Sequence, residues 1–133
     1  NGQRLPAGPW QADGTRLTPT TPVTLSKQAS GITYRIRFSI DRNFMLRAEQ
    51  RVDNTGAAGV VVQPYALINR TDRTASDDMW IAHSGPMGAF GGTANYDVDY
   101  SDLVEDGPVT PEGRVGWTGF TDIYWLTALV PQT

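Results

Sequence analysis

One histidine, His83, is the only residue on which acid–base chemistry near neutral pH could be built in this sequence. Ser84 follows it directly. However, neighbouring residues on a strand point to opposite faces, so adjacency alone does not form a nucleophile and base pair. Nothing in the surrounding pattern requires a proton switch. We therefore predict no catalytic residue and interpret His83 as a structural or surface histidine.

Two further patterns resemble binding motifs without completing them. Asp97, Asp99 and Asp102 suggest calcium, but they lack the glycine-centred spacing of calcium loops, and alternation would place Asp97 and Asp99 on one solvated face of a strand. The glycine-rich stretch 85–92 resembles a phosphate-binding loop, but it has neither the lysine nor the following helix. Its glycines instead indicate positive φ or close backbone approach. We predict no metal and no cofactor.

An alternating row of charged residues is the main candidate for a partner-contact surface. It comprises Arg35, Arg37, Arg47, Glu49 and Arg51. Such a row could dock an acidic partner, but cross-strand Arg and Glu pairs are also the ordinary way in which a sheet keeps its outer face hydrated. Three aromatic residues, Trp80, Tyr96 and Tyr100, could stack on sugar rings, although residues of this type more often belong to a core or its rim.

The elements that must position these residues are short strands. From Thr33 the run TYRIRFSI alternates, with Tyr34, Ile36, Phe38 and Ile40 on one face, and residues 44–54 continue the period after a polar turn at 41–43. The two segments either pair as a hairpin or run on around a bend. We also expect strands at 23–27, in the β-branched run from Val60 with Pro64 at an edge or bulge, and at 122–131.

Short strands joined by turns predict an all-β, antiparallel fold, and we expect its architecture to be a β-sandwich. Residues 84–96 have loop composition, and a brief helical turn is expected at 100–105. Residues 1–22 form a proline-rich irregular lead-in. Since the sequence has no internal repeat or marked boundary, we interpret residues 1–133 as a single domain.

Composition excludes several classes of protein. The net charge is -3, and the ten arginines and one lysine are scattered along the chain, which argues against a nucleic-acid partner. The absence of cysteine excludes disulfides and thiolate sites. No apolar run approaches the roughly 20 residues of a membrane span. Because the chain opens at Asn1 without a signal peptide, we interpret it as a piece of a longer protein.

The final segment has an unusual density of aromatic residues. Gly116 to Gln132 reads GWTGFTDIYWLTALVPQ, in which Gly-Trp is followed by a Tyr-Trp pair and then by Thr-Ala-x-x-Pro. This order resembles the end of the large periplasmic domain in the YidC family of bacterial membrane protein insertases. Residues 32–54, the strand and arginine of 60–70, and the His-x-Gly-Pro of 83–86 are also similar to that family, so the resemblance covers nearly all of 23–132.

The resemblance implies a fold and a role. The family's periplasmic domain is a super-sandwich similar to galactose mutarotases, and it is longer than this chain, which would then be a truncated part of it. The terminal strand has apolar residues on both faces, as expected of a strand covered on both sides. We interpret its aromatic and apolar residues as a structural anchor, comprising Trp117, Phe120, Tyr124, Trp125 and Leu126.

The implied function is non-catalytic: a domain facing the periplasm from the bacterial inner membrane, in a protein that assists insertion and folding of membrane proteins with or without the Sec translocon. The implied partners are nascent membrane proteins and the Sec auxiliary subunits SecF and SecD, with contacts on residues 32–54. A truncated sandwich could also associate with another copy as a homo-oligomer. Two alternatives remain, a mutarotase-like enzyme that would depend on His83 and a carbohydrate-binding module that would depend on Trp80.

Overall fold

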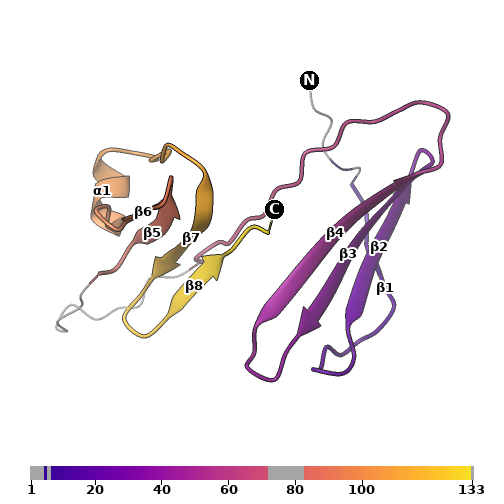
Figure 1. The fold of residues 1–133 in the computed structure, drawn as a ribbon, viewed down its shortest axis with the longest axis horizontal. Helices are drawn as coiled ribbons and strands as arrows, with labels where there is room; N and C mark the ends of the chain where they lie inside the picture. The colour runs from indigo at the N-terminus through magenta and orange to yellow at the C-terminus, as the bar shows by residue number, and fades with distance from the viewer. Residues whose placement is uncertain (1–4, 6, 72–82, 133) are drawn as a thin grey trace. The chain divides into compact units, whose positions relative to one another are not determined.

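In the computed structural model the described residues are 5, 7–71 and 83–132 of the 133-residue chain. The chain forms two compact units, Asn1–Pro64 and Tyr65–Thr133. The described part contains eight strands and one short helix, shown in Figure 1. No helix among the described residues has the length and apolar character needed to cross a membrane.

The first unit is a four-stranded antiparallel sheet with the order β1-β2-β3-β4. Its strands are β1 (Gln11–Ala12), β2 (Val23–Ala29), β3 (Ile32–Ile40) and β4 (Leu46–Asn54). The predicted lead-in of 1–22 therefore contains one short strand, β1. Of the two arrangements predicted for the alternating segments, the hairpin is correct, because β3 and β4 pair in register from Ile32↔Asn54 to Ile40↔Leu46.

Two tight turns fix the register of this sheet. Ser30 and Gly31 join β2 to β3 with φ of 51° and 77°, as a two-residue hairpin turn of the type I′ class requires. Between β3 and β4, Oδ1 of Asp41 accepts hydrogen bonds from the backbone N–H groups of Asn43 (2.8 Å) and Met45 (2.9 Å). Phe44 lies in this turn with φ of 63°. The second strand therefore begins at Leu46 and not at Phe44, which the alternating pattern had included.

Alternation separates the two faces of the first sheet. The side chains of Tyr34, Ile36, Phe38 and Ile40 share one face and are all half-buried, as predicted, whereas Arg35 and Arg37 on the other face are exposed. No hydrophobic residue in the described part of the chain is fully buried. The apolar face is thus covered only partly by the described residues.

The second unit is also a four-stranded antiparallel sheet, with the order β6-β5-β7-β8. It comprises β5 (Pro86–Phe90), β6 (Thr93–Asn95), β7 (Val115–Thr121) and β8 (Leu126–Leu129), with the helix α1 (Tyr100–Glu105) between β6 and β7. The predicted helical turn at 100–105 is confirmed. The all-β, antiparallel prediction is also confirmed, since two antiparallel sheets are the components of a β-sandwich. The mutarotase-like arrangement of such sheets stays a prediction.

The predictions of secondary structure for residues 60–70 and 84–96 are wrong. The run from Val60 to Arg70 forms no strand, although its β-branched residues favour one. Pro64 has no N–H group to donate to a β-ladder. The side chain of Val61 is fully exposed, which shows that no described sheet packs against it. Conversely, residues 84–96 are not a plain loop, because they contain the β5–β6 hairpin, closed by Gly91 and Gly92 with φ of 60° and 87°.

Close backbone contacts at glycines position the second sheet. A Cβ atom added to Gly119 would collide with the backbone of Thr127 and lie 2.9 Å from Cα of Ala128. One added to Gly88 would lie 2.7 Å from the carbonyl oxygen of Trp117. Strands β5, β7 and β8 therefore approach one another more closely at these points than any residue with a side chain permits, which confirms the prediction for Gly88 within the glycine-rich stretch.

Candidate functional site

The predicted arginine-rich surface lies on the polar face of the β3–β4 hairpin. The ladder places Arg37 opposite Glu49, Arg35 opposite Arg51, and Ser39 opposite Arg47. Arg37 Nη1 lies 3.1 Å from Oε2 of Glu49, and both side chains are about half exposed. The structure thus brings all five predicted residues onto one face, which we call the arginine face: Arg35, Arg37, Arg47, Glu49 and Arg51.

Asp53 lies beside these five residues on the same face of the hairpin, and the sequence prediction missed it. Its carboxylate accepts hydrogen bonds from Nε of Arg51, at 2.8 Å, and from Nη1 of Arg35, so one carboxylate joins two arginines that would otherwise repel each other. The sequence does contain a signal for Asp53, because it lies two residues after Arg51 and continues the alternation of charged residues. In the described part of the chain, Arg47 has no carboxylate partner. The face therefore carries four guanidinium groups against two carboxylates on β3 and β4.

Asp13 adds a third carboxylate near this face. Its Oδ1 accepts a hydrogen bond of 2.7 Å from the backbone N–H of Thr24, which lies opposite Arg37 in the β2–β3 ladder. The hydrogen bonds from Thr24 lower the pKa of Asp13, with a smaller contribution from the charge of Arg37. Even with Asp13 included, positive charge remains in excess on the arginine face, and it is concentrated toward Arg47.

The predicted anchor residues divide into two groups. Trp117 and Phe120 lie on β7 and are half-buried. Tyr124, Trp125 and Leu126 are 70%, 75% and 60% exposed. The described residues therefore do not cover the terminal strand on both faces: β8 lies at the outer edge of its sheet and begins at Leu126, after a turn at Ile123 and Tyr124. The structural anchor stays a prediction.

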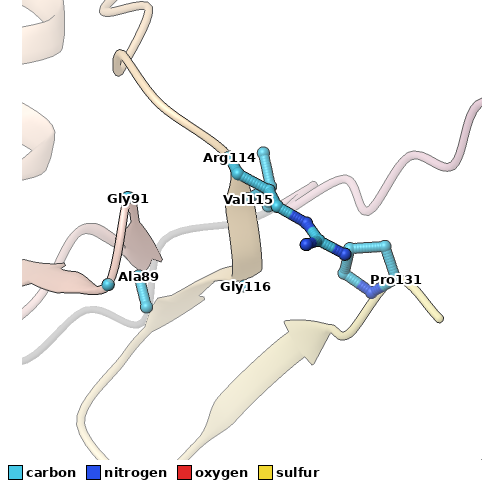
Figure 2. Close-up of a pocket in the computed structure, with 7 residues that line it drawn as sticks. Ala89, Gly91, Arg114, Val115, Gly116 and Pro131 are labelled. Atoms are coloured by element: carbon cyan, nitrogen blue, oxygen red, sulfur yellow. The ribbon is translucent and has the colours of Figure 1, made fainter. Parts of the chain in front are cut away.

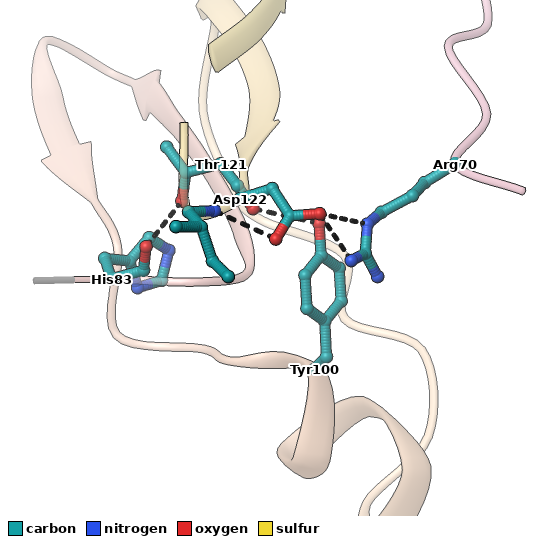
Figure 3. A network of polar contacts seen from close by, with 6 residues as sticks. Arg70, His83, Tyr100, Thr121 and Asp122 are labelled. Atoms are coloured by element: carbon teal, nitrogen blue, oxygen red, sulfur yellow. Dashed lines mark hydrogen bonds and ion pairs between the residues drawn. The ribbon is translucent and has the colours of Figure 1, made fainter. Parts of the chain in front are cut away.

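A part-buried ion pair fixes this turn. Arg70 Nε lies 3.0 Å and Arg70 Nη2 2.5 Å from Oδ2 of Asp122, and the two side chains are only 15% and 12% exposed (Figure 3). The guanidinium carbon of Arg70 also lies 4.4 Å from the ring centroid of Tyr100. We call these three residues, Arg70, Tyr100 and Asp122, the arginine clamp.

Hydrogen bonds from side-chain hydroxyls to backbone carbonyls connect the arginine clamp to β7 and to the segment that precedes β5. The hydroxyl of Tyr100 donates to the carbonyl oxygen of Thr121 (3.1 Å), and the hydroxyl of Thr121 donates to the carbonyl oxygen of His83 (3.1 Å), as Figure 3 shows. Burial raises the pKa of Tyr100, the charge of Arg70 opposes that shift, and the charge of Asp122 adds to it. Sequence reasoning missed the clamp, since Arg70 and Asp122 lie 52 positions apart and share no local pattern.

His83 does not form a catalytic constellation among the described residues. Its Nε2 lies 3.1 Å from the carbonyl oxygen of Pro86, and its ring meets that of Tyr96 edge-on with centroids 6.4 Å apart. No described hydrogen bond joins its ring to Ser84 or to a carboxylate. These contacts fit a structural histidine. Tyr96, one of the aromatic residues considered for sugar stacking, meets the His83 ring and is 59% exposed. Trp80 lies outside the described residues.

The carboxylates considered for calcium have a different structural setting. Asp99 and Asp102 form a capping box at the start of α1, in which the Asp99 side chain accepts from the N–H groups of Ser101 and Asp102 and Asp102 accepts from the N–H of Asp99. The hydrogen bond from the Ser101 hydroxyl is the first cause that lowers the pKa of Asp99. The expectation that Asp97 and Asp99 alternate along a strand is wrong, because β6 ends at Asn95.

One open concavity of about 310 Å³ lies near the β5–β6 turn (Figure 2). Its lining includes Ala89, Gly91, Arg114, Val115 and Pro131, and Figure 2 shows the Arg114 side chain extending toward Pro131. Small-molecule sites usually combine several convergent polar groups with an apolar wall. Here Arg114 is the single charged lining residue, so the concavity supports no ligand assignment. Within the described part of the chain, no group of three His, Cys, Asp or Glu could hold a metal ion.

Comparisons with known proteins agree on one family, over the full chain for the family model and over about nine-tenths of it for the relatives. The family model described as YidC periplasmic domain matches residues 1–133. A protein of Zymomonas mobilis named Membrane protein insertase YidC is 38% identical over 126 residues, which cover 92% of this chain and 22% of that protein. Proteins of the same name from Acidiphilium cryptum and Sinorhizobium fredii are 34% and 38% identical and cover 92% and 89% of this chain. The chain spans about a fifth of the length of these relatives. No solved structure matches it.

Proposed function

Because this chain belongs to the YidC periplasmic domain family, we propose that it is a non-catalytic periplasmic module of a bacterial inner-membrane protein insertase. The observation that carries the proposal is the match of that family over all 133 residues, together with relatives at 34–38% identity that share one name. In the full-length protein, the module would assist the insertion and folding of membrane proteins, with or without the Sec translocon.

The first experiment tests location and activity together. Cells depleted of their own insertase would express the full-length parent protein, and insertion of a model membrane protein would be followed by protease protection. We expect insertion to be restored, and we expect protease added to spheroplasts to cleave within residues 1–133. If these residues stay protected until the inner membrane is lysed, the periplasmic assignment is refuted. If insertion is not restored, the insertase assignment is refuted.

We further propose that the arginine face is the partner-contact surface of this module. Its support is electrostatic: an excess of guanidinium groups on one exposed face favours encounter with an acidic protein surface. Arg47 is the best-placed contact residue, since it is exposed and has no carboxylate partner in the described structure. The proposed partners are SecF, SecD and nascent membrane proteins.

Site-specific photocrosslinking in the full-length protein tests this surface. A crosslinker at Arg47 should capture SecF, SecD or a nascent membrane protein. One at Val104, which is 81% exposed on α1, serves as the control. Arg47→Glu should weaken capture by a crosslinker placed at Arg51, whereas Arg16→Glu makes the same charge change at an exposed arginine outside the arginine face. Equal effects of the two substitutions would refute a specific role for the face.

A further inference from the structure

The turn between β3 and β4 presents a row of apolar side chains to solvent. Phe44, Met45 and Leu46 follow one another in the sequence and are 84%, 68% and 56% exposed. The strand pairing carries them past the rest of the sheet, because β2 begins opposite Phe38 whereas β3 and β4 stay paired up to the turn. We call residues 42–46 the hairpin tip, and Figure 1 shows it at one end of the first sheet.

Hydrogen bonds fix the backbone of the hairpin tip. The N–H of Phe44 donates to the carbonyl oxygen of Asp41 (3.2 Å), and the N–H of Asp41 donates to the carbonyl oxygen of Met45 (3.2 Å). Asp41 and Met45 thus enclose a loop of three residues, and the Asp41 carboxylate binds two further N–H groups of the same loop. The apolar side chains therefore project from a turn of defined conformation.

Phe44 occupies the position of this loop that favours glycine. Three-residue hairpin loops commonly end on a residue in the left-handed conformation, and glycine suits that position because a Cβ is unfavourable there. Phe44 adopts this conformation with φ of 63°. Its ring is 84% exposed, so packing against the described residues does not offset the backbone strain. Since strained residues cluster at sites of ligand contact, the choice of phenylalanine indicates a contact made by the exposed ring.

The charges beside the hairpin tip are mainly positive. Residues 41–47 contain two arginines, Arg42 and Arg47, and one carboxylate, Asp41, so their net charge is 2 − 1 = +1, whereas the chain carries -3. Both arginines are exposed, and neither has a carboxylate partner among the described ion pairs. An apolar protrusion flanked by guanidinium groups complements the surface of an anionic bilayer, in which phosphates lie directly above acyl chains.

The shape of the hairpin tip favours a bilayer over a protein partner. A specific protein interface buries about 800 Å² on each side and encloses its apolar anchors in packed pockets. The tip is narrow, and beyond Leu46 every second residue of β4 from Arg47 is charged. A fluid bilayer accepts a narrow protrusion without a complementary pocket. The relatives are named as membrane protein insertases, so a tethered module beside the membrane needs only a weak contact to dock.

We propose that the hairpin tip docks on the anionic surface of the membrane beside the module, with Phe44 and Met45 among the acyl chains and Arg42 against lipid phosphates. The inference rests on the proposed placement of the module at the inner membrane, but it does not require SecF, SecD or a nascent protein. Docking would fix the β3–β4 hairpin relative to the bilayer.

Lipid quenching in the full-length protein tests the docking. Residues 1–133 contain no cysteine, so any cysteines elsewhere are replaced and a polarity-sensitive fluorophore is attached at Met45→Cys. The protein is reconstituted into vesicles of phosphatidylcholine and phosphatidylglycerol. We expect lipids with brominated acyl chains to quench this label. A control label at Val104→Cys, a position that is 81% exposed on α1, should be quenched by iodide in the water instead.

Three results of this measurement would overturn the proposal. Quenching of the label at Met45→Cys by iodide alone would place the tip in water, and quenching by neither reagent would show that protein covers it. Equal quenching by brominated lipid at Met45→Cys and Val104→Cys would remove any specific role of the tip. A crosslinker at Met45 that captures a protein in cells, in the absence of lipid quenching, would identify a protein contact and overturn the proposal as well.

Substitution of Phe44 separates lipid contact from folding. Asparagine tolerates the left-handed conformation better than phenylalanine, so Phe44→Asn should leave the thermal midpoint of the protein unchanged or raise it. The same substitution should lower the ratio of docked to undocked label about tenfold, because the ring no longer enters the acyl chains. Val61→Asn, at a fully exposed position outside the tip, should not change the ratio. A lower midpoint for Phe44→Asn would show that the ring packs within the protein, and the proposal would fail.

Arg42→Gln tests the contribution of lipid charge. It should lower the ratio of docked to undocked label about fivefold in vesicles with phosphatidylglycerol and much less in phosphatidylcholine alone. Arg16→Gln removes the same charge at an exposed arginine outside the tip and should change neither ratio. Equal effects of the two substitutions would refute docking on anionic lipid. Such a failure would leave the insertase assignment intact, because the protease experiment on spheroplasts tests that assignment separately.

Discussion

Replacement of Arg70 by methionine should destabilise the chain far more than the same replacement at Arg37. Both arginines pair with a carboxylate, but the Arg70–Asp122 pair is 15% and 12% exposed whereas the Arg37–Glu49 pair is 50% and 51% exposed. The exposed pair is hydrated and screened, so its loss costs roughly 0.2–1 kcal/mol. Methionine preserves much of the apolar stem in each case and isolates the effect of the charge.

The expected cost at Arg70 follows from what the substitution leaves behind. Asp122 would keep its position in the turn, where its Oδ1 still accepts a hydrogen bond from the N–H of Ile123 (2.9 Å), but its largely shielded carboxylate would lose the guanidinium that neutralises it. Removal of one partner from a buried pair costs about 3–5 kcal/mol, and the residual exposure of this pair places the estimate near the lower end, at about 3 kcal/mol. The contact of Arg70 with the Tyr100 ring adds about 0.5–1 kcal/mol to that loss.

Urea unfolding of the wild-type chain and of both variants measures the difference. With an m-value of about 2 kcal/mol/M, a loss of about 3 kcal/mol lowers the midpoint by roughly 1.5 M, against at most about 0.5 M for Arg37→Met. In a double-mutant cycle with Asp122→Asn, the combined variant should be more stable than the two separate losses predict. If the two arginine substitutions shift the midpoint equally, the arginine clamp contributes no more than a surface ion pair and the reasoning is refuted.

Three further predictions concern single residues. Burial raises the pKa of Tyr100, so its contribution to stability is complete below the ordinary pKa near 10 and is lost as the pH rises through the folded-state pKa. Tyr100→Phe should therefore reduce the loss of stability at alkaline pH, measured by urea unfolding. At neutral pH the same substitution should cost about 1 kcal/mol, because it removes the hydrogen bond to Thr121. Gly119→Ala should cost about 1–3 kcal/mol in the same assay because its Cβ meets the backbone of β8, while Gly59→Ala, which meets nothing within 4 Å, should be neutral. The pKa of Asp99 is lowered, so its contribution to stability is present above the ordinary pKa near 3.8 and is lost as the pH falls through the folded-state pKa. Asp99→Asn should retain the cap of α1, which the amide chemical shifts of the first turn report, but should remove this dependence of stability on acid pH.

Period-two alternation predicted the faces of β3 correctly because side-chain direction in a strand depends on the backbone alone. Tyr34 and Phe38 share a face whatever the strand pairs with. The choice between a hairpin and consecutive strands could not be made in this way, because it depends on the turn. There, the Asp41 carboxylate satisfies two backbone donors and Phe44 adopts a positive φ, which is uncommon for a bulky residue and has no strong sequence signal.

The wrong predictions share a physical cause. Local propensity favours a strand at Val60–Val62, but a strand also needs a neighbour to complete its hydrogen bonds, and the described residues provide none. Residues 84–96 have the composition of a loop, yet Gly88 is required where β5 and β7 pack closely, and Gly91 and Gly92 close a hairpin. In both cases tertiary pairing decided the outcome.

Among the described residues, the acidic and basic side chains considered for chemistry mostly make structural contacts. His83 contacts a backbone carbonyl, Asp99 caps a helix, and Asp122 and Arg70 neutralise each other. Among the described residues, what remains for recognition is the charge at Arg47 and the exposed apolar side chains at the hairpin tip and at β8. Substitutions should therefore separate into two classes in the full-length protein: those in the arginine clamp lower insertion activity only as far as they lower stability, whereas Arg47→Glu lowers activity at unchanged stability. Loss of activity in an Arg70→Met protein whose thermal midpoint is restored by stabilising substitutions elsewhere would contradict this separation and would give the clamp a direct role.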